Sequence, residues 1–140
     1  MIKVEYEQVR AYKLRCLEYA RTNFQGKSFF NRNKQIWIAV SRLGLNEWFS
    51  KTKTFAQAES ILQLKDMLEK SIYTHTEKNE HPKKGDEHST FDYFVYRLTI
   101  DQVMYDAVLT IKNVRGVGAI YYHHYLDDIK IKPPASILQP

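Results

Sequence analysis

The sequence predicts an α+β fold in which N-terminal helices pack on one face of a roughly four-stranded antiparallel sheet. Two segments, 5–24 and 55–73, repeat apolar residues at three- and four-residue spacing, which is typical of amphipathic helices. The last third, 91–129, alternates β-branched or aromatic residues with polar ones between short turns, which is typical of strands. A length of 140 residues is usual for one domain. We therefore expect residues 1–140 to form a single domain.

The first helix, 5–24, should end before Gly26, because glycine commonly terminates helices. It contains Cys16, the single cysteine of the chain, which cannot form an internal disulfide and is expected to pack as a small apolar residue. The basic connection 27–34 leaves room for a short strand. The β-branched and aromatic segment 35–41 is predicted to be a strand.

Segment 42–45 reads as a turn, and Asn46 is the expected cap of a short helical turn after it. Thr54 is expected to cap the second long helix, 55–73, whose wide apolar stripe indicates burial against a sheet. The polar residues 74–90 should form a flexible loop. Its three histidines are irregularly spaced and have no cysteine beside them, so no metal site is expected.

The three predicted C-terminal strands are 91–100, 103–113 and 118–126. A tight link at Asp101-Gln102 joins the first two strands, and the link 114–117 contains Gly116, which readily takes positive φ. Such short links predict a three-stranded antiparallel meander. An extended tail is expected at 130–140, where three prolines occur.

Side chains alternate between the two faces of a strand, so each strand should have a core face and an open face. The core-face residues of the first strand are Phe94, Tyr96, Leu98 and Ile100. Those of the second strand are Val103, Tyr105, Ala107, Leu109 and Ile111. The third strand offers two sets of alternating residues. The more apolar set is Ile120, Tyr122, His124 and Leu126, and the other is Ala119, Tyr121, His123 and Tyr125. A register shift of one residue would exchange His123 for His124 on the open face, so both stay candidates.

Cationic, aromatic and hydroxyl side chains are expected to gather on the open face. Histidine suits proton transfer near neutral pH, lysine and arginine bind phosphate, and aromatic rings stack on bases. The predicted catalytic set is His123, His124, Arg97, Lys51 and Lys53. The predicted RNA-binding set is Tyr121, Tyr93, Thr110 and Lys112.

The net charge of +5 is unevenly distributed, because residues 1–54 hold eleven basic and four acidic side chains. Such a basic surface suits an anionic partner such as RNA. No segment approaches the length of a membrane span, and the N-terminus lacks the apolar core of a signal peptide. We expect a cytoplasmic protein without membrane contact, and delivery into a target cell by a route without a cleaved signal is compatible with this sequence.

Three stretches carry a resemblance to a known group of proteins: residues 34–44, 64–73 and 121–126, the last reading Tyr-Tyr-His-His-Tyr-Leu. In this order they resemble the BECR group, the barnase–EndoU–colicin–RelE-like nucleases, in the versions attached to large polyvalent proteins of phages and mobile elements. The resemblance spans roughly residues 14–129. It implies helices packed against a four-stranded antiparallel sheet.

The activity implied by the resemblance is metal-independent cleavage of RNA. The 2′-hydroxyl attacks the adjacent phosphate, while a base removes its proton and a cation stabilises the charged phosphorane. This implies a toxin-like endoribonuclease that acts on tRNA or rRNA without a cofactor, with a cognate immunity or antitoxin protein as a further partner. The alternative on the same fold is a non-catalytic phage or mobile-element protein that binds a partner, for example an inhibitor of host defence.

Overall fold

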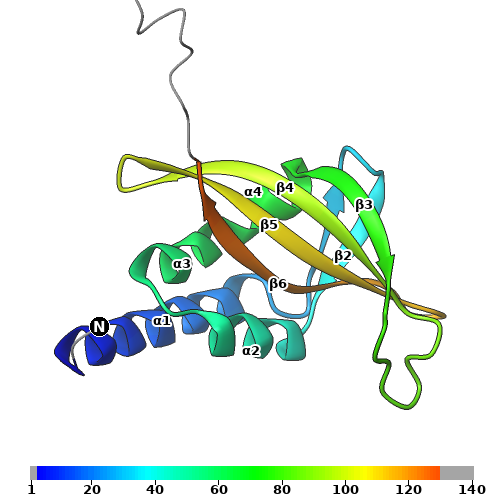
Figure 1. The fold of residues 1–140 in the computed structure, drawn as a ribbon, viewed down its shortest axis with the longest axis horizontal. Helices are drawn as coiled ribbons and strands as arrows, with labels where there is room; N and C mark the ends of the chain where they lie inside the picture. The colour runs from blue at the N-terminus through cyan, green and yellow to red at the C-terminus, as the bar shows by residue number, and fades with distance from the viewer. Residues whose placement is uncertain (1–2, 130–140) are drawn as a thin grey trace, which may run out of the picture.

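A curled six-stranded sheet forms the centre of the computed structural model, which describes residues 3–129 (Figure 1). In spatial order its strands are β1 (Ser28–Asn31), β2 (Ile36–Val40), β6 (Gly118–Asp128), β5 (Val103–Val114), β4 (Thr90–Ile100) and β3 (Ile72–Lys78). Neighbouring strands run antiparallel except β2 and β6, which are parallel. The α+β class and the β4–β5–β6 meander are confirmed. The sheet is larger than predicted and mixed, and the predicted tail 130–140 lies outside the described residues.

The helices are α1 (Lys3–Asn23), α2 (Arg42–Lys51), α3 (Phe55–Ser60), the 3-10 helix η1 (Ile61–Gln63) and α4 (Leu64–Lys70). The first predicted helix is confirmed as α1. The predicted helix 55–73 is interrupted at η1 and ends at Lys70, because Ser71 is already extended, with φ −65° and ψ 154°. The last two residues of that prediction belong to β3.

The core lies between these helices and one face of the sheet. Phe94 and Leu98 of β4 and Leu109 and Ile111 of β5 are buried there, as their alternation predicts. Cys16 of α1 is buried in the same cluster. The opposite face of β4, β5 and β6 is called the open face below, because its side chains are mostly half-buried or exposed.

Helix α2 begins five residues earlier than predicted. Ser41, not Asn46, is its N-cap, and the Ser41 hydroxyl accepts a hydrogen bond from the backbone N–H of Gly44. Gly44 is buried against β6, where a Cβ atom would collide with the backbone carbonyl oxygen of Tyr121. The predicted turn 42–45 was wrong because this glycine serves close packing of a helix on a strand rather than a turn.

Strand β3 occupies part of the segment predicted to be a loop. Almost all of its side chains are exposed, since it is an edge strand, so it lacks the apolar alternation that marks half-buried strands. It is held by backbone pairing with β4 and by His75, whose ring stacks on Tyr93 with centroids 4.7 Å apart. The loop proper is therefore 79–89.

The turn between β1 and β2 reaches across to β3 and β4 and so closes the curl of the sheet. The Asn33 side-chain oxygen accepts a hydrogen bond from the backbone N–H of Tyr73, at 2.9 Å. The Lys34 ammonium pairs with the buried carboxylate of Asp92 and lies 4.1 Å from the centre of the Tyr73 ring. These contacts connect segments far apart in sequence.

Replacing Asp92 with asparagine should remove a pH-dependent part of the stability. Burial alone would raise the pKa of this carboxyl, but hydrogen bonds from Lys34, Thr76 and Asn113 bring it below its ordinary value. A carboxyl with a lowered pKa in the folded state stabilises the protein above its unfolded pKa of about 4, and this contribution is lost as the pH falls further. In urea titrations, the free energy of unfolding of the wild type should fall more steeply below about pH 4 than that of Asp92→Asn. Equal slopes would contradict a stabilising role for the Lys34–Asp92 pair.

Candidate functional site

A β-bulge in β6 decides which histidine faces outward. Thr110 of β5 pairs with His123, but the next residue, Ile111, pairs with Tyr121, so Tyr122 is the extra residue. A bulge of this kind breaks the strict alternation of side chains. As a result Tyr121 and His124 both face the core, at 0% and 1% exposure, whereas Tyr122 and His123 are half-buried on the open face. Neither of the two alternating sets predicted from the sequence describes this strand.

His124 belongs to a closed hydrogen-bond network in the core. Its Nε2 lies 2.6 Å from the Ser60 hydroxyl, and its Nδ1 lies 2.7 Å from the Tyr121 hydroxyl. The Ser60 hydroxyl donates its single proton to the backbone carbonyl of Gln57, at 2.6 Å. His124 therefore donates from Nε2–H to Ser60 and accepts at Nδ1 from Tyr121.

Burial also fixes the charge of His124. Desolvation, followed by the neighbouring His123, lowers the pKa of His124 to about 3. The imidazole is thus neutral at pH 7, and it stacks against Trp48 with ring centroids 6.5 Å apart. The Gln57 side-chain amide additionally donates to the His124 backbone carbonyl at 2.7 Å, on the side of β6 that faces away from β5 and lies beyond the end of its pairing with β2. We assign His124 and Tyr121 to the core, which removes both from the surface predicted to touch RNA.

His123 lies between two hollows, one between β6 and the helices and the other on the open face. One, of ≈ 450 Å³, lies along β6 beside the end of α2, and its lining includes Lys51 and Lys53. The other, of ≈ 330 Å³, is lined by Phe91, Tyr93, Thr110, Tyr122, His123 and Tyr125. Together they form the His123 site, in which one imidazole has cations on one side and aromatic rings on the other.

The charge state of His123 follows from partial burial and a neighbouring lysine. Burial, then the positive charge of Lys51, lowers the pKa of His123 to about 4, and Glu47 opposes this shift. The ring is therefore neutral at pH 7 and can accept a proton. The Lys51 ammonium forms an ion pair with Glu47 at 3.1 Å and lies 5.5 Å from the centre of the Tyr122 ring.

Replacing Lys51 with methionine should raise the pKa of His123. The ammonium disfavours a second positive charge nearby, so its removal makes protonation of the ring easier. An NMR titration of the His123 ring should give a midpoint above the wild-type value of about 4. Lys53→Met is the matched control, because Lys53 contributes no such shift and its ammonium is engaged with the Ser50 carbonyl at 3.1 Å. An unchanged midpoint in Lys51→Met would contradict this electrostatic coupling.

The structure gathers some of the other predicted residues and separates the rest. Tyr93 and Thr110 line the His123 site. Arg97 lies four residues along β4 from Tyr93 and lines neither hollow. Its exposed side chain donates a hydrogen bond to the Asp106 carboxylate at 3.1 Å. Lys112 lines an adjacent cavity, where it pairs with Asp86 of the loop 79–89 at 2.6 Å.

Three aromatic residues of the second hollow were missed from the sequence: Phe91, Tyr122 and Tyr125. Their aromatic character was visible, and Tyr125 shares the alternation of His123, but Tyr122 joins this face only through the bulge, which no sequence signal marks. A second aromatic feature on the same side was also missed. Phe30 and Trp37 pair across β1 and β2 with ring centroids 5.3 Å apart, and Trp37 is 63% exposed.

Comparison with protein families gives one match. The family described as large polyvalent protein-associated domain 3 matches residues 7–130, which is most of the chain. This agrees with the polyvalent-protein part of the resemblance. Comparisons with curated proteins and with solved structures found no match.

Within residues 3–129, no helix combines the length and apolar character needed to cross a membrane. Within the same range, no group of three or more His, Cys, Asp or Glu side chains is arranged to hold a metal ion.

Proposed function

The chain belongs to the large polyvalent protein-associated domain 3 family, and we propose that it is an endoribonuclease of the BECR type that uses His123 and needs no metal. The observation that carries the proposal is the placement of His123. Its neutral imidazole lies on the open face, between Lys51 and Lys53 on one side and the rings of Tyr93, Tyr122 and Tyr125 on the other. A single-stranded RNA needs such a combination, since rings stack on bases and lysines attract phosphates.

The proposed reaction assigns one step to each group. His123 removes the proton of the 2′-hydroxyl as that oxygen bonds to the adjacent phosphorus. Lys51 stabilises the negative charge of the phosphorane. The bond from phosphorus to the 5′-oxygen breaks, and the leaving oxygen takes a proton from water, which gives a 2′,3′-cyclic phosphate and a 5′-hydroxyl. His124 and Arg97 take no part in this version of the catalytic set.

The low pKa of His123 has a kinetic consequence. A base with a pKa of about 4 is weaker than one near neutrality, so cleavage should be slow. The base is already fully available at mildly acidic pH. The rate, kcat/KM, should therefore be nearly flat from about pH 7 down to about pH 5 and fall below that.

The test is incubation of purified protein with total tRNA and rRNA in the presence of EDTA. We expect cleavage at discrete sites, with products that end in a cyclic phosphate. RNA that stays intact at micromolar protein would remove the nuclease proposal, and cleavage that requires an added metal ion would remove its mechanism. tRNA or rRNA would be the physiological target, with a cognate immunity protein as its natural inhibitor.

A second candidate function is binding of a protein partner without catalysis, and the Phe30–Trp37 pair favours it. Exposed tryptophans are frequent energetic centres of protein interfaces, and few side chains of the described residues are as exposed for their size as Trp37. Pull-down from host cells with wild type and Trp37→Ala tests this function. This function is supported over RNA cleavage if the wild type retains a single protein that Trp37→Ala does not, and if the wild type leaves RNA intact in the cleavage assay.

A further inference from the structure

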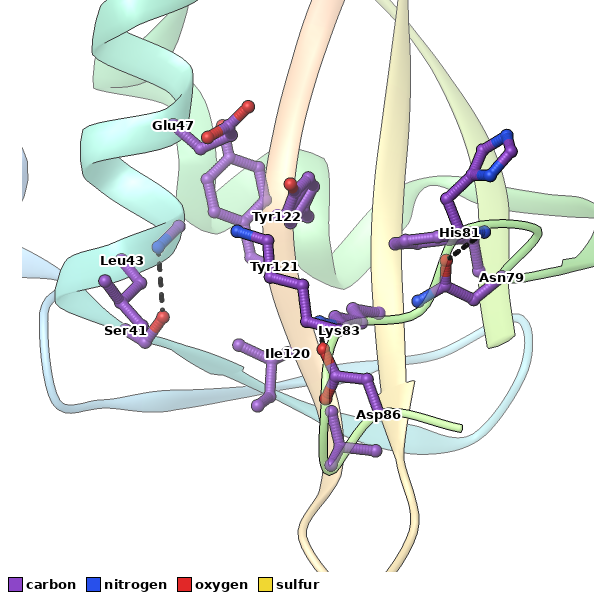
Figure 2. A pocket seen from close by; sticks show the side chains of 14 residues that line it. Ser41, Leu43, Glu47, Asn79, His81, Lys83, Asp86, Ile120, Tyr121 and Tyr122 are labelled. Carbon is purple, nitrogen blue, oxygen red and sulfur yellow. Dashed lines mark hydrogen bonds and ion pairs between the residues drawn. The ribbon is translucent and has the colours of Figure 1, made fainter. Parts of the chain in front are cut away.

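A separate cavity of ≈ 480 Å³ lies next to the His123 site (Figure 2). Its walls come from three parts of the fold that are distant in sequence. Figure 2 shows Leu43 and Glu47 on the α2 side, Lys83 and Asp86 on the side of the loop 79–89, and Tyr122 on β6 between them. Cavities of about 300–1,000 Å³ are the usual size for small-ligand sites.

The cavity and the His123 site share two aromatic walls. Phe91 and Tyr122 line both, and their rings lie 5.7 Å apart. Tyr122 also lies next to His123, with ring centroids 5.2 Å apart. A chain molecule that passes His123 can therefore continue along this wall into the cavity.

The lining combines apolar surface with charges of both signs, since two lysines and two carboxylates line it. One of these carboxylates, Glu47, already forms an ion pair with Lys51 of α2. Leu43, at 80% exposure, and Ile120 provide apolar contact area. Lys112 is occupied by its ion pair with Asp86, which ties the loop to β5. The ammonium of Lys83, in contrast, has no hydrogen-bond or ion-pair partner within residues 3–129. The cavity thus offers an apolar wall and the ammonium of Lys83, which is available to a ligand.

We propose that this cavity binds one nucleotide of the RNA strand, next to the nucleotide whose phosphate is cleaved at His123. This inference rests on the proposed function. The base lies against Tyr122 and Leu43, and its phosphate pairs with Lys83. The cavity then determines which base is accepted beside the cleavage site, a role separate from that of His123 in catalysis.

The experiment is an NMR titration of the protein with each of the four nucleoside 5′-monophosphates. At least one should shift the backbone signals of the residues around Leu43, Lys83 and Tyr122. Lys83→Glu should weaken that binding roughly tenfold, because a charge-assisted contact with the phosphate becomes a repulsion. Lys65→Glu is the matched control, since Lys65 is an exposed lysine of α4 that does not line the cavity. The Lys65→Glu protein should bind the nucleotide with the affinity of the wild type.

A second variant tests the apolar wall without threatening the fold. Leu43→Ala should weaken nucleotide binding about threefold, because Leu43 is exposed and its truncation removes only contact with the ligand. The control is Leu62→Ala on η1, which should leave binding unchanged because Leu62 does not line the cavity. Two results would overturn the inference. One is the absence of signal shifts with all four nucleotides at about 10 mM, and the other is an equal loss of nucleotide affinity in Lys83→Glu and Lys65→Glu.

Failure of the inference and failure of the proposed function give different results. RNA cleavage by a wild type that binds none of the four nucleotides in the cavity would overturn the inference alone. Nucleotide binding that depends on Lys83, in a protein that leaves RNA intact, would support the cavity as a nucleotide site and remove the cleavage proposal. His123→Ala should bind the nucleotide as the wild type does.

Discussion

Replacing His123 with alanine should slow RNA cleavage by about 100-fold or more, because general-base catalysis contributes about that much. Thermal stability should change little, since His123 is half-buried on the open face and its ring has no hydrogen-bond partner among residues 3–129. RNA binding should persist, because the rings of Tyr93 and Tyr122 and the charge of Lys51 remain. Cleavage rates and binding constants measured separately would show this pattern.

The matched variant is His124→Ala, and it should behave in the opposite way. It leaves a cavity in the core and removes the hydrogen-bond partner of the Tyr121 hydroxyl, which together should cost about 3 kcal/mol of unfolding free energy. At a temperature where this variant is still folded, its cleavage rate should approach that of the wild type. Loss of cleavage in folded His124→Ala, with retention in His123→Ala, would contradict the assignment of the two histidines.

Replacing Gly44 with alanine should destabilise the protein by about 3 kcal/mol, even though Gly44 lies inside a helix. Helix propensity alone predicts the reverse, a gain of roughly 0.5–1 kcal/mol, because alanine has the higher propensity. The packing effect should dominate, since the new methyl group would collide with the backbone carbonyl of Tyr121, which cannot move without disturbing β6. Urea unfolding monitored by circular dichroism measures both the sign and the size of the change in unfolding free energy.

Ser50→Ala is the control for the Gly44 substitution. Ser50 is an exposed residue of the same helix, and its hydroxyl bonds only to the Glu47 carbonyl one turn earlier. Its replacement should change the unfolding free energy by less than about 0.5 kcal/mol. A stabilised Gly44→Ala protein would mean that α2 does not lie against β6 at Tyr121, and the hollows beside β6 would then have a different shape.

The parts of the fold that sequence predicts well are those with strong periodicity. The alternation in β4 and β5 placed Phe94, Leu98, Leu109 and Ile111 in the core, and the spacing in α1 located that helix to within two residues. Strand β3 escaped prediction because an exposed edge strand needs no apolar alternation. Its stability comes from pairing with β4, which is a property of the tertiary structure.

The candidate site was only partly predictable for a related reason. Strict alternation cannot place both Tyr122 and His123 on one face, and only the pairing of β5 with β6 reveals the bulge. Lys51 and Lys53 lie beside His123 because α2 follows directly from β2, which is the parallel neighbour of β6. Arg97 was assigned to the right face but lies too far along β4 to join them.

The central claim is that the open face around His123 receives RNA while His124 stays in the core. The most direct test is NMR of the histidine rings during titration with a 2′-O-methyl RNA hexamer, which binds like RNA but has no attacking hydroxyl. We expect the His123 ring signals to shift with saturation and those of His124 to stay in place. A His123 ring that does not respond at saturating RNA, or shifts confined to another surface, would contradict the claim.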